Sequence, residues 1–196
     1  MRAAVLLSLF AAGCANHRYF APRENANGTG PDGHPAAVYA MPPPVQGDVR
    51  VWSQGTRMAE DDGVEEVELR VGFEIENTGT AVLAIEPGSI QCDEVEYTEG
   101  TLTAVRPVAT EGVQDAQPGD STRFDVVFRL PDVRGPRDVD GFTLRFRVTA
   151  AGQPLLTQVT PFVPYVIENR HGDWYGGHGW YWGSSFGFGF ASHWCW

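Results

Sequence analysis

The sequence predicts an all-β protein, an antiparallel sandwich or barrel, and three observations lead to this fold class. Several segments alternate strictly between apolar and polar residues, which is the period of a half-buried strand. Turn-forming residues separate these segments at short intervals. No segment shows the convincing periodicity of an amphipathic helix. Regular short strands divided by turns are typical of sandwiches and barrels.

The clearest strand lies within residues 64–77, VEEVELRVGFEIEN. Apolar residues occupy its odd positions from 67 to 75, and the even positions from 66 to 76 carry charged residues except at Gly72: Glu66, Glu68, Arg70, Glu74 and Glu76. We expect the first set to face the core and the glutamates to face solvent. The segments STRFDVVFRL and GFTLRFRVT repeat this alternation with phenylalanine, valine and leucine on one face.

The rest of the chain is divided by composition. The segments AVLAIE, SIQCDEVEY, TLTAVRPVAT and LLTQVTPFV bring the expected total to about seven to nine strands in a domain that covers residues 47–167. Residues 14–46 are rich in glycine, asparagine and proline and predict a disordered tether, within which AAVYAM (36–41) is a candidate edge strand. Residues 168–196 form a tail rich in glycine and aromatic residues.

The run VELRVGFEIENTGTAVLAIEPGSI, followed later by QPGDSTRFDVVFRLP, resembles the immunoglobulin-like sandwich modules of bacterial surface and periplasmic proteins. The resemblance covers roughly residues 48–165 and implies an immunoglobulin-like β-sandwich. It implies no catalytic residues, since unrelated functions share this fold.

The first residues, MRAAVLLSLFAAGC, carry a second resemblance. Arg2 precedes a short apolar stretch, and Ala11-Ala12-Gly13-Cys14 resembles the lipobox of bacterial lipoproteins. The resemblance implies a signal peptide over residues 1–13, acylation with palmitate-type chains at Cys14, and a lipid anchor in the cell envelope. Ala15 resembles the outer-membrane default of such proteins. Ordinary signal peptidase would cut the same bond, so secretion without lipid is the alternative.

The net charge of −11 limits the classes of partner that the protein is expected to bind. The chain has fourteen arginines and no lysine. An acidic protein of this kind is not expected to bind nucleic acid, which requires cations that neutralise phosphates. The negative charge also argues against electrostatic docking on anionic lipid. We therefore expect membrane attachment through the N-terminal lipid, an envelope protein or glycan as partner, and no cofactor.

Catalysis is not expected, because the nucleophile–base pairs that enzymes use are missing from the pattern. No serine lies in a GxSxG motif, and no histidine falls within residues 47–167. Carboxylates cluster at 60–62, 65–66, 93–96 and 138–140, and we interpret them as solvent-facing strand residues in preference to a calcium site.

The remaining candidates lie at cysteines and in the tail. If lipid takes Cys14, Cys92 and Cys195 are a candidate disulfide, which would close a loop of about 100 residues and contribute up to roughly 4.7 kcal/mol. The histidines that are candidate metal ligands are His171, His178 and His193. The tryptophans that are candidates for surface contact are Trp174, Trp180, Trp182, Trp194 and Trp196. The tail admits three interpretations: disorder, folding back onto the sandwich, or contact with lipid headgroups or glycan.

These observations predict a lipid-anchored cell-envelope protein with a structural or binding role and no enzymatic activity. The alternative is a metal- or glycan-binding module that uses the tail.

Overall fold

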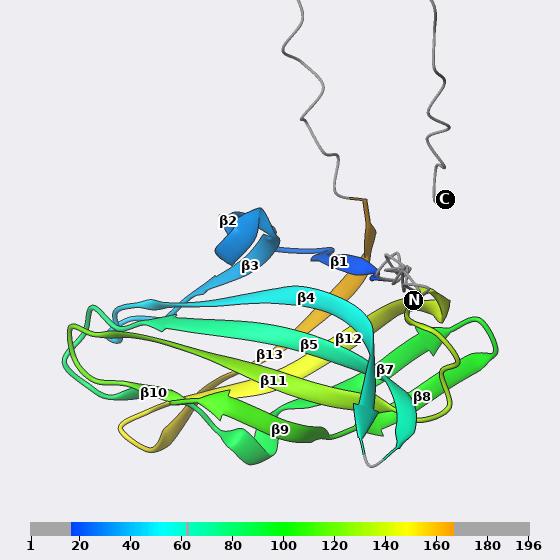
Figure 1. The fold of residues 1–196 in the computed structure, drawn as a ribbon. Helices are drawn as coiled ribbons and strands as arrows, with labels where there is room; N and C mark the ends of the chain where they lie inside the picture. Colours follow the sequence, from blue (N-terminus) through cyan, green and yellow to red (C-terminus); the bar gives the residue numbers. More distant parts are fainter. Residues whose placement is uncertain (1–16, 62, 167–196) are drawn as a thin grey trace, which may run out of the picture. The chain divides into compact units, whose positions relative to one another are not determined.

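The computed structural model describes residues 17–61 and 63–166, and within these ranges the chain folds into β-strands and short 3₁₀-helices (Figure 1). The strands are β1 (Tyr19–Pro22), β2 (Gly28–Thr29), β3 (Pro35–Ala40), β4 (Asp48–Asp61), β5 (Val64–Glu76), β6 (Leu83–Ile85), β7 (Gln91–Tyr97), β8 (Gly100–Val105), β9 (Pro107–Gly112), β10 (Asp115–Ala116), β11 (Ser121–Leu130), β12 (Val139–Ala150) and β13 (Gln153–Tyr165). The 3₁₀-helices are η1 (Pro31–Gly33), η2 (Pro87–Ser89) and η3 (Pro136–Asp138). None of the helices in the described ranges has the length and apolarity that crossing a membrane requires.

The first sheet has six strands in the order β2-β3-β4-β5-β11-β9. Its centre is the long hairpin of β4 and β5, which pairs from Asp48 opposite Glu76 to Asp61 opposite Val64. Gly63 in the hairpin turn has φ +80°, a left-handed conformation that glycine adopts without steric strain. β11 pairs antiparallel with the other edge of β5.

The second sheet has seven strands arranged around β12. β13 pairs along one edge of β12, while β7 and β6 share the other edge. β8 continues the sheet beyond β7, and β10 continues it beyond β6. β1 lies outside β13, with Tyr19 opposite Tyr165, so the first and last described strands are neighbours (Figure 1).

The two sheets pack against each other as a β-sandwich, and the core lies between them. The ring of Phe73 on β5 meets the edge of Phe146 on β12 with 5.3 Å between centroids. The hydroxyl groups of Tyr39 on β3 and Thr160 on β13 are 2.7 Å apart in a buried hydrogen bond. Apolar packing and a satisfied polar contact therefore both link the two layers.

The predicted fold class is confirmed, and so is the alternation from which it was inferred. The residues at odd positions from Val67 to Ile75 are all fully buried. The number of strands in the described ranges exceeds the prediction because β1, β2 and β3 precede residue 47 and because one expected strand divides between the sheets. TLTAVRPVAT becomes β8, which pairs with β7 in the second sheet, and β9, which pairs with β11 in the first.

The prediction of a disordered tether is wrong for residues 17–46. β1 pairs with β13, and β3 is not an edge strand but lies between β2 and β4. Phe20 and Ala37 are fully buried in the core, and Met41 is 6% exposed. The glycines and prolines of this region lie mostly in turns and at strand ends. The average composition of this segment does not reveal its short strands, because they are stabilised by pairing with strands that lie elsewhere in the sequence.

Candidate functional site

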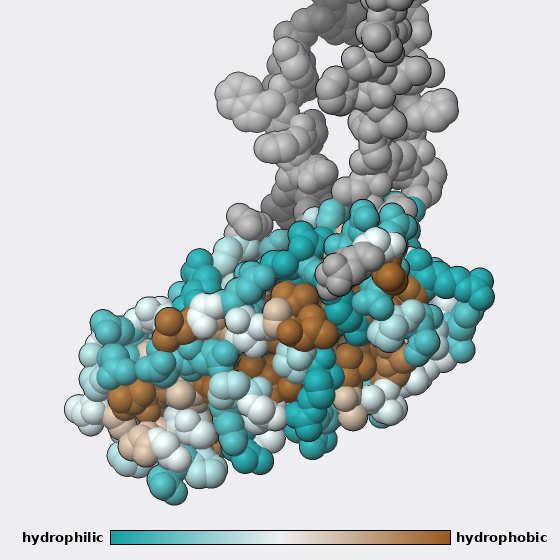
Figure 2. Space-filling model, turned by 60° about the horizontal axis from the view of Figure 1, so that its bottom comes forward, coloured by the Kyte–Doolittle hydropathy of each residue, from teal (hydrophilic) through white to brown (hydrophobic). Residues whose placement is uncertain are grey.

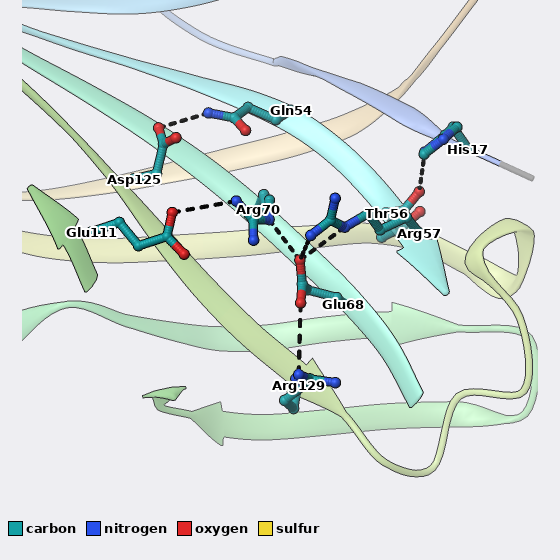
Figure 3. Close-up of polar contacts among 9 residues, drawn as sticks. All are labelled: His17, Gln54, Thr56, Arg57, Glu68, Arg70, Glu111, Asp125 and Arg129. Atoms are coloured by element: carbon teal, nitrogen blue, oxygen red, sulfur yellow. Dashed lines mark hydrogen bonds and ion pairs between the residues drawn. The ribbon is translucent and has the colours of Figure 1, made fainter. Parts of the chain in front are cut away.

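The outer face of the six-stranded sheet carries a cluster of charged residues centred on Glu68 (Figure 3). Glu68 occupies an even position of β5, so it points away from the core, as the alternation requires. The strand register places Arg57 of β4 and Arg129 of β11 on either side of it. Arg70, two positions along β5, lies on the same face. Glu68 is consequently only 3% exposed, so the prediction that it faces solvent is wrong.

The three arginines contact Glu68 from different directions. Arg57 Nη2 is 2.7 Å from Glu68 Oε1, and Arg70 Nε donates a hydrogen bond of 2.6 Å to the same oxygen. Arg129 Nη2 lies 3.8 Å from Oε2 on the other side of the carboxylate (Figure 3). Arg70 also reaches Glu111 on β9, with Nη1 and Oε2 3.5 Å apart. The cluster therefore connects four neighbouring strands of one sheet.

The electrostatics of the cluster favour the ionised form of the Glu68 carboxyl group. Burial by itself raises the pKa of its carboxyl group, but hydrogen bonds and positive charge from Arg70 and Arg57 outweigh burial and lower the pKa below its usual range. The hydrogen bond to Glu68 in turn raises the pKa of Arg70. A general acid or base needs a pKa near the working pH, so Glu68 is unsuited to proton transfer and suited to holding strands together.

Trp52 lies on the same outer face, in a socket formed by two glycines. It is 1% exposed, and a Cβ atom added at Gly72 would stand 2.3 Å from its Cε2. A Cβ atom at Gly30 would stand 2.7 Å from its Cγ. The Arg123 guanidinium carbon lies 5.7 Å from the centroid of the indole ring. The indole is covered, so this tryptophan offers no surface for stacking a ligand.

Two of the five histidines belong to the folded region, although the sequence placed all five outside the sandwich domain. The ring of Tyr19 stacks with the imidazoles of His17 and His34, at centroid distances of 6.3 and 5.2 Å. His17 Nδ1 donates a hydrogen bond of 3.2 Å to the carbonyl oxygen of Thr56. Neither imidazole is hydrogen-bonded to a hydroxyl or thiol of the described residues. The correction follows from β1 and β3, whose pairing brings this segment into the fold.

Cys92 is the one candidate site residue that the described ranges contain. It is fully buried in the core, where burial and then the charge of Asp93 raise the pKa of its thiol well above the usual range. The other candidates lie outside the described residues: Cys14, Cys195, His171, His178, His193, Trp174, Trp180, Trp182, Trp194 and Trp196. Lipidation, the disulfide and the tail sites stay predictions.

Candidate metal ligands do not come together in the part of the chain that the structure describes. No group of three or more histidine, cysteine, aspartate or glutamate side chains there is arranged to hold an ion.

Large apolar side chains are exposed at scattered positions in the described ranges, and hydrophilic residues separate the apolar areas in the view of Figure 2. The exposed residues are Met58, Val64, Val108, Val113, Val159, Val163 and Val166.

The outer face of the seven-stranded sheet contains two hollows of opposite charge. One, of about 160 Å³, is lined by Arg23 and by the acidic residues Glu94, Glu96 and Asp140. The other, of about 190 Å³, is lined by Arg106, Arg145 and Arg147 together with Ser89, Gln91 and Thr157. Neither hollow was foreseen from the sequence, because its residues come from separate strands. The alternation of charged residues in TLRFRV was the one local signal for the second hollow.

The chain matches no protein-family model, no curated protein and no solved structure.

Proposed function

We propose that this protein is a lipid-anchored protein of the bacterial cell envelope, held at the outer membrane by acyl chains on Cys14. Its role is structural or binding, and it is not an enzyme. One observation carries the proposal: a short apolar segment after Arg2 ends in Ala11-Ala12-Gly13-Cys14. Two or three acyl chains anchor a protein stably, since each buried methylene contributes about 0.8 kcal/mol.

The fold sharpens this proposal in one respect. The first described strand, β1, begins at Tyr19, only five residues after Cys14. Five residues span at most about 18 Å, so an acyl anchor on Cys14 would hold the start of β1 within that distance of the acylated residue. The protein would then present the sandwich at the membrane surface.

The non-catalytic role is supported by how the charged residues are used. Glu68 is saturated by arginines and has a lowered pKa, which suits a structural clamp. The immunoglobulin-like resemblance agrees with a module that binds or supports other envelope components.

Metabolic labelling with an alkyne fatty acid tests the anchor. We expect label on the full chain, none on Cys14→Ser, and undiminished label on Cys195→Ser, which removes a different cysteine. The mass of the mature protein should also show cleavage before residue 14. An unlabelled wild-type chain would overturn the proposal.

The alternative role is metal or glycan binding by the tail, which rests on its histidines and tryptophans. Calorimetry with zinc, copper and envelope glycans would compare the full chain with a chain ending at Asn169. Binding that only the full chain shows would favour this role, and equal heats from both chains would exclude it.

A further inference from the structure

The basic hollow on the seven-stranded sheet is built from three segments of the chain. Arg145 and Arg147 are two positions apart on β12, so both side chains leave the same face of the sheet, about 7 Å apart along the strand. Arg106 lies between β8 and β9 and reaches η2, where its Nη1 donates a hydrogen bond of 2.8 Å to the carbonyl oxygen of Gly88. The hollow thus brings together three guanidinium groups in a chain whose net charge is −11.

Each of these arginines uses only part of its hydrogen-bonding capacity within the described residues. Arg145 Nη2 is 2.7 Å from Asp93 Oδ2, and Arg147 Nη1 is 3.0 Å from Glu86 Oε2. A guanidinium group carries five N–H donors, so most of those in the hollow are left for water or a ligand. The side chains of Arg145 and Arg147 are 50% and 45% exposed, which keeps these donors accessible.

The basic hollow differs from the cluster around Glu68 because no carboxylate of the protein lines it. On the other sheet, three arginines contact one carboxylate of the protein itself, and that carboxylate fills the space between them. Beside the hollow, Asp93 and Glu86 each contact a single arginine, and neither carboxylate lines the hollow itself. Three positive charges against two negative charges leave a net positive site, with open volume of about 190 Å³ beside the guanidinium groups.

We propose that this hollow binds a small oxyanion, a carboxylate or a phosphate, carried by a hydrophilic ligand such as an acidic sugar. Guanidinium groups recognise such oxyanions through charge-assisted, often bidentate hydrogen bonds. At roughly 30 Å³ per water molecule, the volume corresponds to about six waters, which leaves room for more than the oxyanion itself.

The neutral polar side chains of the hollow suit the rest of such a ligand. Ser89 Oγ accepts a hydrogen bond of 2.9 Å from the backbone N–H of Arg147 and donates one of 2.6 Å to the carbonyl oxygen of Glu86. Gln91 Nε2 donates a hydrogen bond of 2.6 Å to Asp93 Oδ1, and its carbonyl oxygen can accept another. The hydroxyl group of Thr157 also lines the hollow. These groups can hydrogen-bond to sugar hydroxyls.

The test is a titration of the full-length chain followed by NMR or calorimetry at constant ionic strength, with Cys14→Ser so that no sample carries lipid. The probes are inorganic phosphate, glucuronate and glucose 6-phosphate, with neutral glucose for comparison. We expect saturable binding of the charged probes that weakens about tenfold or more in Arg147→Gln, because a charge-assisted hydrogen bond is lost. Inorganic phosphate tests the hollow for binding of a phosphate group, and glucuronate tests it for binding of a carboxylate on a sugar.

The matched control is Arg134→Gln. Arg134 also pairs with a glutamate at 3.0 Å, is 79% exposed, and does not line the basic hollow, so its loss removes the same charge elsewhere. Unchanged affinity in this variant supports the site. Equal weakening in both variants, binding of glucose as tight as that of glucuronate, or no saturable binding of any charged probe would overturn the proposal. Each result is separate from the labelling of Cys14, so the binding role and the anchor can fail independently.

Discussion

Substitution of Gly72 by alanine gives the sharpest test of the packing on the outer face of the six-stranded sheet. The added Cβ would stand 2.3 Å from Trp52 Cε2 and 2.4 Å from Cζ2, whereas nonbonded carbons approach to about 3.5–4.0 Å. The indole has to move by more than about 1 Å to relieve this clash. It has little freedom to do so, since Gly30 approaches its Cγ and only 1% of the residue is exposed.

Overpacking of this kind costs about 1–3 kcal/mol, and the constrained indole places the expected loss in unfolding free energy near 3 kcal/mol. For a chain of this size, each kcal/mol lowers Tm by about 2–4 °C, so we expect a decrease of about 6–12 °C. Thermal unfolding followed by far-UV circular dichroism measures it, with urea unfolding as a second determination. Gly88→Ala is the control, because a Cβ there meets no atom within 4 Å.

A double-mutant cycle separates steric conflict from other effects of the substitution. Phenylalanine at position 52 lacks the indole atoms nearest Gly72, so Gly72→Ala should lose most of its effect in a Trp52→Phe background. The reasoning is refuted if Gly72→Ala unfolds at the wild-type temperature, or if its effect is the same in both backgrounds.

Three further predictions concern buried polar groups. Glu68→Gln should lower the unfolding free energy by about 2 kcal/mol at pH 7, against at most about 1 kcal/mol for Glu99→Gln in an exposed pair. The folded-state pKa of Glu68 is lowered, so its contribution to the unfolding free energy is present above the usual pKa of 4.5 and is lost as pH falls through the folded-state pKa. The unfolding free energy measured with urea should therefore fall less steeply on acidification in Glu68→Gln than in wild type. Tyr39→Phe leaves the buried Thr160 hydroxyl without its partner and should cost about 1–2 kcal/mol, much of it recovered with Thr160→Val; equal losses in the single and double variants would contradict this. Cys92 should react with a thiol reagent only when urea unfolds a chain carrying Cys14→Ser and Cys195→Ser, and fast native labelling would show that the core opens around it.

Much of the fold was predictable because alternation is a local property. The inward set on β5, from Val67 to Ile75, can be read from consecutive letters, and every odd position there is buried. The inner faces of β11 and β12 follow from the same pattern, as Phe124 and Phe146 show. These residues account for the two layers and for the core between them.

The charged clusters were not predictable, because they depend on register. Glu68 looks like any solvent-facing strand glutamate until Arg57 and Arg129 are placed opposite it. The basic hollow likewise needs Arg106 to arrive beside β12 from the turn between two sheets. A shift of a strand by one residue would turn each of these side chains to the other face, so only the paired structure assigns their neighbours.

The sequence by itself determined the β class, the inward faces of the long strands, the acidic charge and a candidate anchor at Cys14. Tertiary structure decided that residues 17–46 belong to the sandwich, that Trp52 is enclosed by Gly30 and Gly72, and that Glu68 is buried beneath arginines. The physical reason is the range of the interactions. A strand's faces follow from its own alternation, whereas the partner of β1 is β13, at the other end of the described chain. Whether a polar residue such as Glu68 or a short strand such as β1 is buried depends on the strands that pair beside it.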